Sequence, residues 1–186
     1  MSFPQLDWLT AQWGAVLGAS LLAAATDLKD RRIPNWLTAP VALGGLLHAA
    51  LAGGVATFGS HLGASVLLAL PFVLLFLMAG GGAGDAKMMG AIGAWLGLSD
   101  GTVTLVSVVI AGGVLAVLWT LIRREGRTVL NNLLIMAYGL SALACGRQKL
   151  TDAGSVMPPT AGMRKMPYGV AILLGVCIAA PLCAHG

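Results

Sequence analysis

The chain has 186 residues, of which 58% are hydrophobic and only 10% are charged, with a formal net charge of +4. This composition is far from that of soluble domains and excludes an ordinary water-soluble enzyme or binding module. Basic residues in a membrane protein most often mark its cytoplasmic side. We therefore expect the chain to lie in the lipid bilayer and do not expect it to bind nucleic acid.

Five apolar stretches approach the ~20 residues that a helix needs to cross ~30 Å of hydrocarbon. They cover residues 11–26, 37–57, 61–79, 102–122 and 167–184. Two further apolar stretches are ambiguous, because 86–98 is short for a span and 128–145 contains Asn131, Asn132 and Tyr138. The placement of the basic residues decides between them.

The basic residues predict six spans. If 86–98 spans and 128–145 does not, all 11 basic residues fall on the cytoplasmic side, while Asp7 and Asp100 fall outside. A seventh span at 128–145 would move the basic residues before the last span outward. We therefore predict an all-α, polytopic membrane protein with six transmembrane helices, both termini outside, and an interfacial or re-entrant helix at 128–145 before the last span.

The sequence shows no convincing internal repeat or second domain. We predict one membrane-embedded domain over residues 1–186, with a cytoplasmic loop at about 123–166 that carries the interfacial helix. No basic residue precedes Asp27, so the N-terminus lacks the positive region of a cleaved secretory signal. We expect the first helix to be retained.

Two carboxylates stand out because they fall inside predicted spans. Five of the seven acidic residues have places in caps or polar loops: Asp7, Asp30, Asp100, Glu125 and Asp152. Counting ~1.5 Å per residue from Trp13, and back from Asp100, puts both Asp27 and Asp85 roughly 21 to 22 Å from the outer surface. A charged aspartate in a span costs at least ~2.5 kcal/mol, so such residues usually mark function. These two are predicted to form a pair.

Paired carboxyl groups have a definite chemistry. They cannot both ionise cheaply, so the pair holds a single proton and can supply both a base and an acid. In peptide hydrolysis the ionised aspartate would take a proton from water, while the protonated one polarises the scissile carbonyl. The two roles belong to the pair and are left symmetric.

This chemistry requires neither a metal nor a cofactor. The three cysteines form no CxxC pair and no ligand cluster with histidines: Cys145, Cys177 and Cys183. We therefore predict no zinc site, no disulfide framework and no cofactor.

The glycines before Asp85 resemble a protease signature. Gly82, Gly84 and Asp85 match the GxGD signature of intramembrane aspartic proteases, and Lys87 extends the match to GxGDxK. Because glycine permits unusual backbone angles, we expect a non-helical segment here that lets a substrate strand approach the carboxylate. Such backbone is tolerated at membrane depth only where protein or a water-filled cavity satisfies its polar groups.

Two further segments make the resemblance specific to type IV prepilin peptidases. The segment TDLKDRRIPNWLT resembles the family's D-x4-R-x-P-N pattern at Asp27, Arg32, Pro34 and Asn35. A third segment resembles the family's KxPYG stretch and contains Lys165, Pro167 and Tyr168. The resemblance covers about residues 20–175 and implies catalysis by Asp27 and Asp85.

The resemblance also implies a substrate and a location. It implies hydrolysis between the short cytoplasmic leader and the mature helix of prepilins and pseudopilins, in the bacterial inner membrane. The methyltransferase region of bifunctional members, with its paired CxxC cysteines, has no counterpart in this sequence. The compact form resembles the peptidases of tight-adherence (Flp) pilus systems, and archaeal preflagellin peptidases are similar enough to remain an alternative.

The other motif residues allow two interpretations each. Arg32 and Lys87 could be positive-inside anchors, or could attract an acidic substrate residue or tune the aspartates. Pro34 and Asn35 could end one helix and cap the next. Tyr168 could be an interfacial aromatic residue or a polar group lining the site.

A proton- or cation-coupled transporter lined by Asp27 and Asp85 is the main alternative function. A path across the bilayer would also need access from the outer side. There the predicted spans offer only His48 and His61, near their ends. A noncatalytic scaffold would leave both aspartates unexplained, so prepilin leader peptidase is the predicted function.

Overall fold

The computed structural model of the protein describes residues 5–79, 82–123 and 168–184. Regular structure in these ranges is helical, in the order α1 (Gln5–Asp30), α2 (Asn35–Ala79), α3 (Ala83–Arg123) and α5 (Tyr168–Ala184). The predicted all-α class is confirmed for them. The interfacial or re-entrant helix expected at 128–145 lies outside the described residues, as does nearly all of the expected loop at 123–166.

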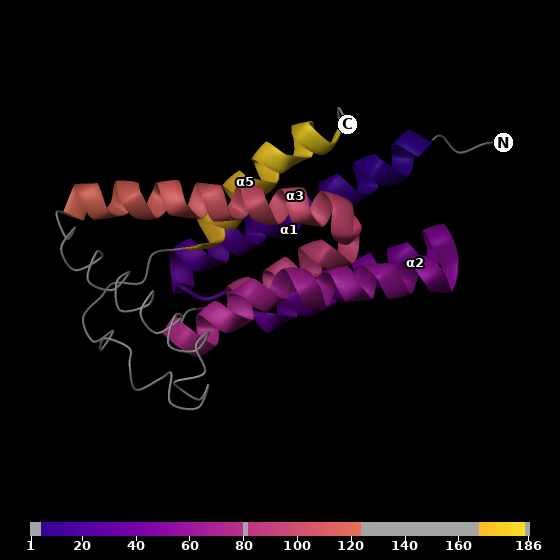
Figure 1. Ribbon diagram of the computed structural model, residues 1–186, viewed down its shortest axis with the longest axis horizontal. Coiled ribbons are helices and arrows are strands. Elements are labelled where there is room, and N and C mark those ends of the chain that lie inside the picture. The colour runs from indigo at the N-terminus through magenta and orange to yellow at the C-terminus, as the bar shows by residue number, and fades with distance from the viewer. Residues whose placement is uncertain (1–4, 80–81, 124–167, 185–186) are drawn as a thin grey trace, which may run out of the picture.

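α2 and α3 each consist of two helices that meet at a glycine. The break falls at Gly54, with φ +70°, and at Gly97, with φ +69°. Glycine adopts such left-handed angles because it has no Cβ. The chain reverses direction at both glycines, so α2 and α3 are helical hairpins (Figure 1). Together with α1 and α5, their halves correspond to the six apolar segments predicted as spans.

One predicted boundary is displaced. The second apolar stretch is predicted to run to residue 57, whereas the observed turn is at Gly54. Polar side chains near the turn bond to the helix backbone instead of forming a loop: Thr57 Oγ1 donates to Gly53 O at 3.0 Å, and Ser60 Oγ to Thr57 O at 2.8 Å. These residues therefore belong to the start of the returning helix.

The outer faces of the helices suit a lipid environment. The stretches Asn35–Leu77 and Ala83–Ile122 are long and apolar enough to cross a membrane, by length and composition. Large apolar side chains on them are exposed, with Leu51 at 73%, Val55 at 87% and Ile122 at 78%. An apolar surface of this extent is unfavourable in water and favourable against acyl chains.

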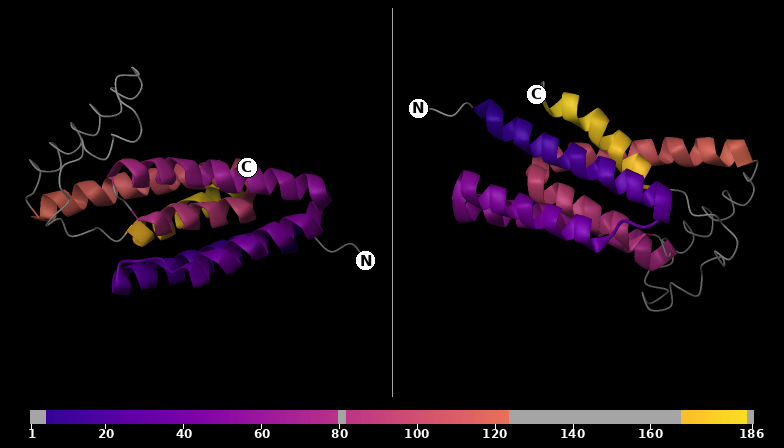
Figure 2. Two further views of the ribbon diagram at one scale, coloured as in Figure 1. Left: turned by 90° about the horizontal axis from the view of Figure 1, so that it is seen from below. Right: turned by 180° about the vertical axis from the view of Figure 1, so that it is seen from behind.

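The first half of α3 forms the centre of the bundle. Its residues Met88, Met89 and Ile92 are fully buried, and they pack with Val16 of α1 and Ile172 of α5. Figures 1 and 2 show the start of α1, the end of α5 and both glycine turns at one end of the bundle. The α1–α2 connection and the starts of α3 and α5 lie at the opposite end.

The glycine-turn end is joined by contacts around Trp95. Its indole Nε1 donates to Val41 O of α2 at 2.7 Å, and its ring lies 5.2 Å from that of His48. His61 Nδ1 hydrogen-bonds to Ala94 O at 3.0 Å. The two histidines, expected near the outer ends of the spans, thus pack between α2 and α3.

Candidate active site

Asp27 lies in the last turn of α1 and is only 7% exposed. Beyond it the helix ends at Asp30, and Arg31, with φ +52°, turns the chain toward α2 while its N–H donates to Asp27 O at 2.9 Å. Pro34 O accepts from the backbone N–H groups of Leu37 and Thr38, at 3.1 and 3.3 Å. The predicted turn is therefore present, and Asp27 lies just before it.

Asp85 lies in the first turn of α3 and is half-buried. Its N–H donates to Gly82 O at 3.1 Å. The expected non-helical segment is described only at Gly82, since the helix begins at Ala83 and residues 80 and 81 lie outside the described ranges. Gly84 is therefore helical, and the expectation of unusual backbone there is wrong.

The role of Gly84 is close packing. A Cβ at this position would lie 2.9 Å from Ile33 Cβ and 3.2 Å from Ile33 O, closer than ordinary contacts allow. The absence of a side chain therefore lets the α1–α2 turn rest directly on the start of α3. Ile33 is itself buried at 7% exposure, which anchors the turn in the core.

A hydrogen bond makes a second link between the same two segments. Lys87 Nζ donates to Asn35 Oδ1 at 2.8 Å. Asn35 is the first residue of α2, where a capping role was one expectation, but its side chain is engaged by α3 instead. Two residues of different motifs, 52 positions apart, thus join the segments that carry the aspartates.

The two carboxylates occupy one site. The charge of Asp27 acts on Asp85, which puts them within electrostatic range of each other. They come from the end of α1 and the start of α3, which meet at one end of the bundle (Figure 1). The structure therefore brings the two predicted aspartates to the same end of the bundle, and their catalytic pairing stays a prediction.

α5 contacts Asp27 directly. Gly169 N–H donates to Asp27 Oδ2 at 2.7 Å, in a buried hydrogen bond. A Cβ on Gly169 would lie 2.9 Å from Asp27 Cβ and 3.1 Å from Ala23 O, so only glycine lets the helices approach this closely. The sequence indicates Gly169 only as the last residue of the KxPYG stretch, and a backbone donor has no side chain that would predict this contact.

Tyr168 packs inside the bundle. It is half-buried and meets Phe72 edge-on, with ring centroids 5.8 Å apart. Its hydroxyl lies against Gly112 and within electrostatic range of Asp85. This position fits a group that lines the site. The neighbouring motif residues Lys165 and Pro167 lie outside the described residues.

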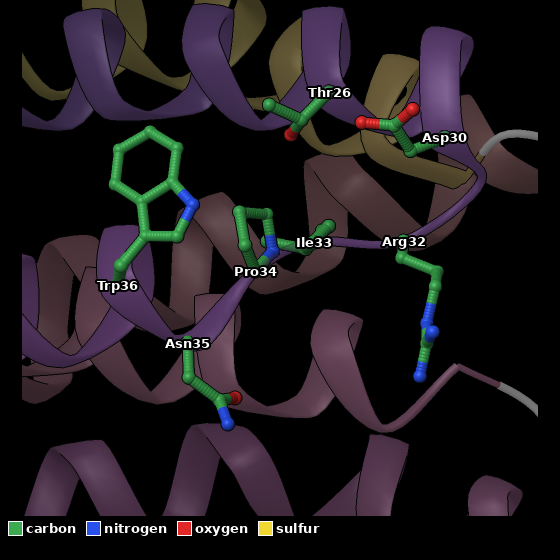
Figure 3. Close-up of a pocket in the computed structure, with 7 residues that line it drawn as sticks. All are labelled: Thr26, Asp30, Arg32, Ile33, Pro34, Asn35 and Trp36. Atoms are coloured by element: carbon green, nitrogen blue, oxygen red, sulfur yellow. The ribbon is translucent and has the colours of Figure 1, made fainter.

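A pocket of about 370 Å³ lies at the α1–α2 turn. It is lined by residues of both helices and of the turn between them: Thr26, Asp30, Arg32, Ile33, Pro34, Asn35 and Trp36 (Figure 3). Three of these, Arg32, Pro34 and Asn35, belong to the motif that contains Asp27. Arg32 and Asn35 are exposed. Among the residues that the structure describes, no three His, Cys, Asp or Glu side chains are grouped to hold a metal ion.

Comparison with known proteins gives concordant matches. The model of the type IV leader peptidase family matches residues 14–117, more than half of the chain, including both aspartates. A prepilin leader peptidase/N-methyltransferase of Aeromonas salmonicida (strain A449) is 36% identical over 128 residues, 63% of this chain and 44% of the relative. One of Aeromonas hydrophila is 41% identical over 100 residues, 48% and 34% respectively.

The chain thus spans less than half the length of the curated relatives that it matches. No solved structure matches it. The matched family and relatives are peptidases by name, which gives the transporter alternative no support.

Proposed function

The chain belongs to the type IV leader peptidase family, and from that premise we propose that it is an aspartic prepilin leader peptidase whose catalytic residues are Asp27 and Asp85. Its substrates are prepilins and pseudopilins, including those of Flp-type pili. It hydrolyses the bond between the short leader and the mature hydrophobic helix.

The observation that carries this proposal is the meeting of two carboxylates from distant segments inside an apolar bundle. Asp27 is almost fully buried, and Asp85 lies within electrostatic range of Asp27. Burying a carboxylate costs free energy unless it is hydrogen-bonded, and ionisable residues inside a membrane protein usually serve its function. Gly169 N–H satisfies one oxygen of Asp27, which fixes the carboxylate while leaving the pair free to hold a water.

The chemistry follows from the shared proton. The ionised aspartate removes a proton from water as the water oxygen attacks the scissile carbonyl carbon, and the protonated aspartate hydrogen-bonds to the carbonyl oxygen. In the collapse of the tetrahedral intermediate the C–N bond breaks, the leaving nitrogen takes a proton from the pair, and the carbonyl reforms. The pair ends with one proton, as it began.

The remaining motif residues support the pair. Gly84 and Lys87 hold the α1–α2 turn against α3 through Ile33 and Asn35, and this sets the separation of the aspartates. Gly82, Arg32, Pro34 and Tyr168 surround the same end of the bundle. We retain Lys165 and Pro167 as supporting residues on the strength of their motif alone.

We propose that residues 1–186 form one domain that crosses the bacterial inner membrane six times, with both termini outside and the site on the cytoplasmic side. The helix directions support this topology, because the start of α1 and the end of α5 share one end of the bundle (Figure 2). The basic residues of the described ranges all belong to segments that end or begin at the site end: Lys29, Arg31, Arg32, Lys87 and Arg123.

The proposal is tested by cleavage of a co-expressed prepilin, followed as a mobility shift on gels. Wild type, Asp27→Asn, Asp85→Asn and the control Asp100→Asn are compared at equal abundance in the membrane. We expect full-length prepilin to accumulate with both site variants and to be processed by wild type and the control. Normal processing by either site variant would refute the paired mechanism.

A further inference from the structure

The side chain of Tyr168 has no part in the chemistry described so far. Tyr168 is the first residue of α5, and the next residue, Gly169, donates its N–H to Asp27 Oδ2 at 2.7 Å. This buried bond fixes the start of α5 on one of the two aspartates. The Tyr168 side chain extends from the same short segment to α3, where it lies within electrostatic range of Asp85. The first two residues of α5 therefore reach both aspartates.

Two contacts hold the tyrosine ring in place. The ring meets Phe72 of α2 edge-on, with centroids 5.8 Å apart and an angle of 68° between the ring planes. On α3, Gly112 leaves the space that the hydroxyl end of the ring occupies, since a Cβ there would lie 2.7 Å from Tyr168 Cζ and 2.9 Å from Cε2. Ordinary contacts of a Cβ are longer than this. Three helices therefore set the position of one hydroxyl group.

The hydroxyl group of Tyr168 is available to a bound molecule. Within the described ranges it forms no hydrogen bond to either carboxylate or to any other group. A tyrosine hydroxyl inside an apolar bundle normally has a hydrogen-bond partner. Two neighbouring donors are already engaged, because Gly169 N–H bonds to Asp27 and Lys87 Nζ bonds to Asn35. The Tyr168 hydroxyl therefore remains for a substrate, whereas these two donors do not.

The proposed reaction creates a need for such a donor. As water attacks, the scissile carbonyl oxygen gains negative charge, and the protonated aspartate supplies one hydrogen bond to it. An oxyanion is stabilised most by donors that are fixed in position before the charge develops. A tyrosine hydroxyl is a neutral donor that keeps its proton at neutral pH. It can therefore donate to the oxyanion without changing the number of protons on the aspartates.

We propose that Tyr168 is a further catalytic residue, whose hydroxyl donates a hydrogen bond to the scissile carbonyl oxygen and to the oxyanion that forms from it. The inference rests on the proposed function. The O–H bond of Tyr168 stays intact through attack and collapse, and the two aspartates carry all the proton transfers. The negative charge of the tetrahedral intermediate is then stabilised by two donors, the protonated aspartate and Tyr168.

Two other roles for Tyr168 lead to different expectations. If the ring only packs against Phe72, phenylalanine would replace tyrosine without loss of rate. If the hydroxyl instead bonds to Asp85 in the working enzyme, it is a positioning group, and its removal would change the ionisation of the aspartates and the pH dependence of the rate. A donor to the oxyanion lowers the rate at every pH by the same factor.

The test compares Tyr168→Phe with wild type, both as the full chain in phospholipid vesicles with a purified prepilin. The substitution removes one oxygen and keeps the ring that contacts Phe72. Loss of one oxyanion donor typically costs roughly a hundredfold to a thousandfold in rate. We expect kcat per folded molecule to fall about a hundredfold, with KM within about twofold of wild type. Tyr138→Phe, at the chain's other tyrosine, is the matched control and should cleave at the wild-type rate.

Two further measurements separate the three roles. The pH profile of kcat/KM should keep its shape and fall in height, whereas a shift of either limb would make Tyr168 a positioning residue and overturn the proposal. The second probe is a prepilin peptide with a difluoroketone in place of the scissile amide, which hydrates to a tetrahedral diol. Tyr168→Phe should weaken its binding by about the factor by which kcat/KM falls. Equal binding of this analogue to both enzymes would also overturn the proposal.

Failure of this inference and failure of the proposed function give different results. If wild type cleaves the prepilin and Tyr168→Phe cleaves it with the same kcat, the oxyanion role is wrong and the peptidase function stands. If wild type leaves the prepilin intact, the proposed function itself fails, and the role of Tyr168 fails with it.

Discussion

Contacts at the end of the bundle that holds the aspartates position acidic side chains, whereas at the opposite end the contacts around Trp95 join α2 and α3 beside two glycine turns. At the site end, Ile33 rests on Gly84 and Lys87 donates to Asn35, so the α1–α2 turn is positioned by α3. These contacts connect residues far apart in sequence. They can therefore fix the relative position of Asp27 and Asp85, which come from different helices.

At the other end, the chain reverses at Gly54 and Gly97 through left-handed angles that are intrinsic to each residue. No charged group is needed for such a reversal. We therefore expect substitutions at the site end to change catalysis more than stability, and substitutions in the glycine turns to change stability more than catalysis. Three experiments test this contrast.

Gly169→Ala has the largest expected effect of the three. The new Cβ would lie 2.9 Å from Asp27 Cβ and 3.1 Å from Ala23 O, so α5 or the aspartate must move. Misplacement of a catalytic group by about 1 Å can cost roughly a hundredfold in rate, and we expect kcat for prepilin cleavage to fall by about that factor. Gly18→Ala, where nothing lies within 4 Å, is the matched control. An unchanged kcat would show that Gly169 does not position Asp27.

Gly97→Ala should act on stability. An L-residue at φ +69° costs about 1 to 2 kcal/mol, and the new Cβ would also lie 3.1 Å from His61 Nε2. We expect a lower unfolding temperature in detergent, with kcat per folded molecule close to wild type. Gly113→Ala, in open space, controls for the added methyl group. A fall in kcat without a fall in stability would erase the contrast between the two ends.

The Lys87–Asn35 bond should give the smallest effect. Lys87→Met and Asn35→Ala each remove the same 2.8 Å hydrogen bond, so each should lower kcat about fivefold, and the double variant should be no worse than either. Asn35→Asp keeps an acceptor for the ammonium group and should restore most of the rate. Additive losses in the double variant would mean that the two residues act separately.

Much of the fold could be predicted because lipid restricts what a chain can do. Apolar stretches and charge placement gave the helical class and the halves of α2 and α3, including the short segment that begins α3. The turn at Gly54 was misplaced by a few residues, because Thr57 and Ser60 bond to the helix backbone and behave as helical residues. A polar residue near a span end does not by itself mark a loop.

The site was only partly accessible from the sequence. Unexplained charges in spans identify Asp27 and Asp85, and helix rise predicts their common depth. The function of Gly84 was misjudged, since both flexibility and close packing favour glycine and only the neighbouring Ile33 distinguishes them. The bond from Gly169 could not be foreseen, because apolar helices carry little information on which of them touch.

The most direct measurement is the cleavage rate of a purified prepilin by Asp27→Asn, Asp85→Asn and the double variant in vesicles, each checked for folding against wild type. Groups that act as one unit are strongly non-additive when removed. We predict that each single variant loses roughly a thousandfold or more in kcat and that the double variant loses no more. A single variant that retains a substantial rate, or a double variant that loses the product of the two single losses, would contradict the paired-aspartate site.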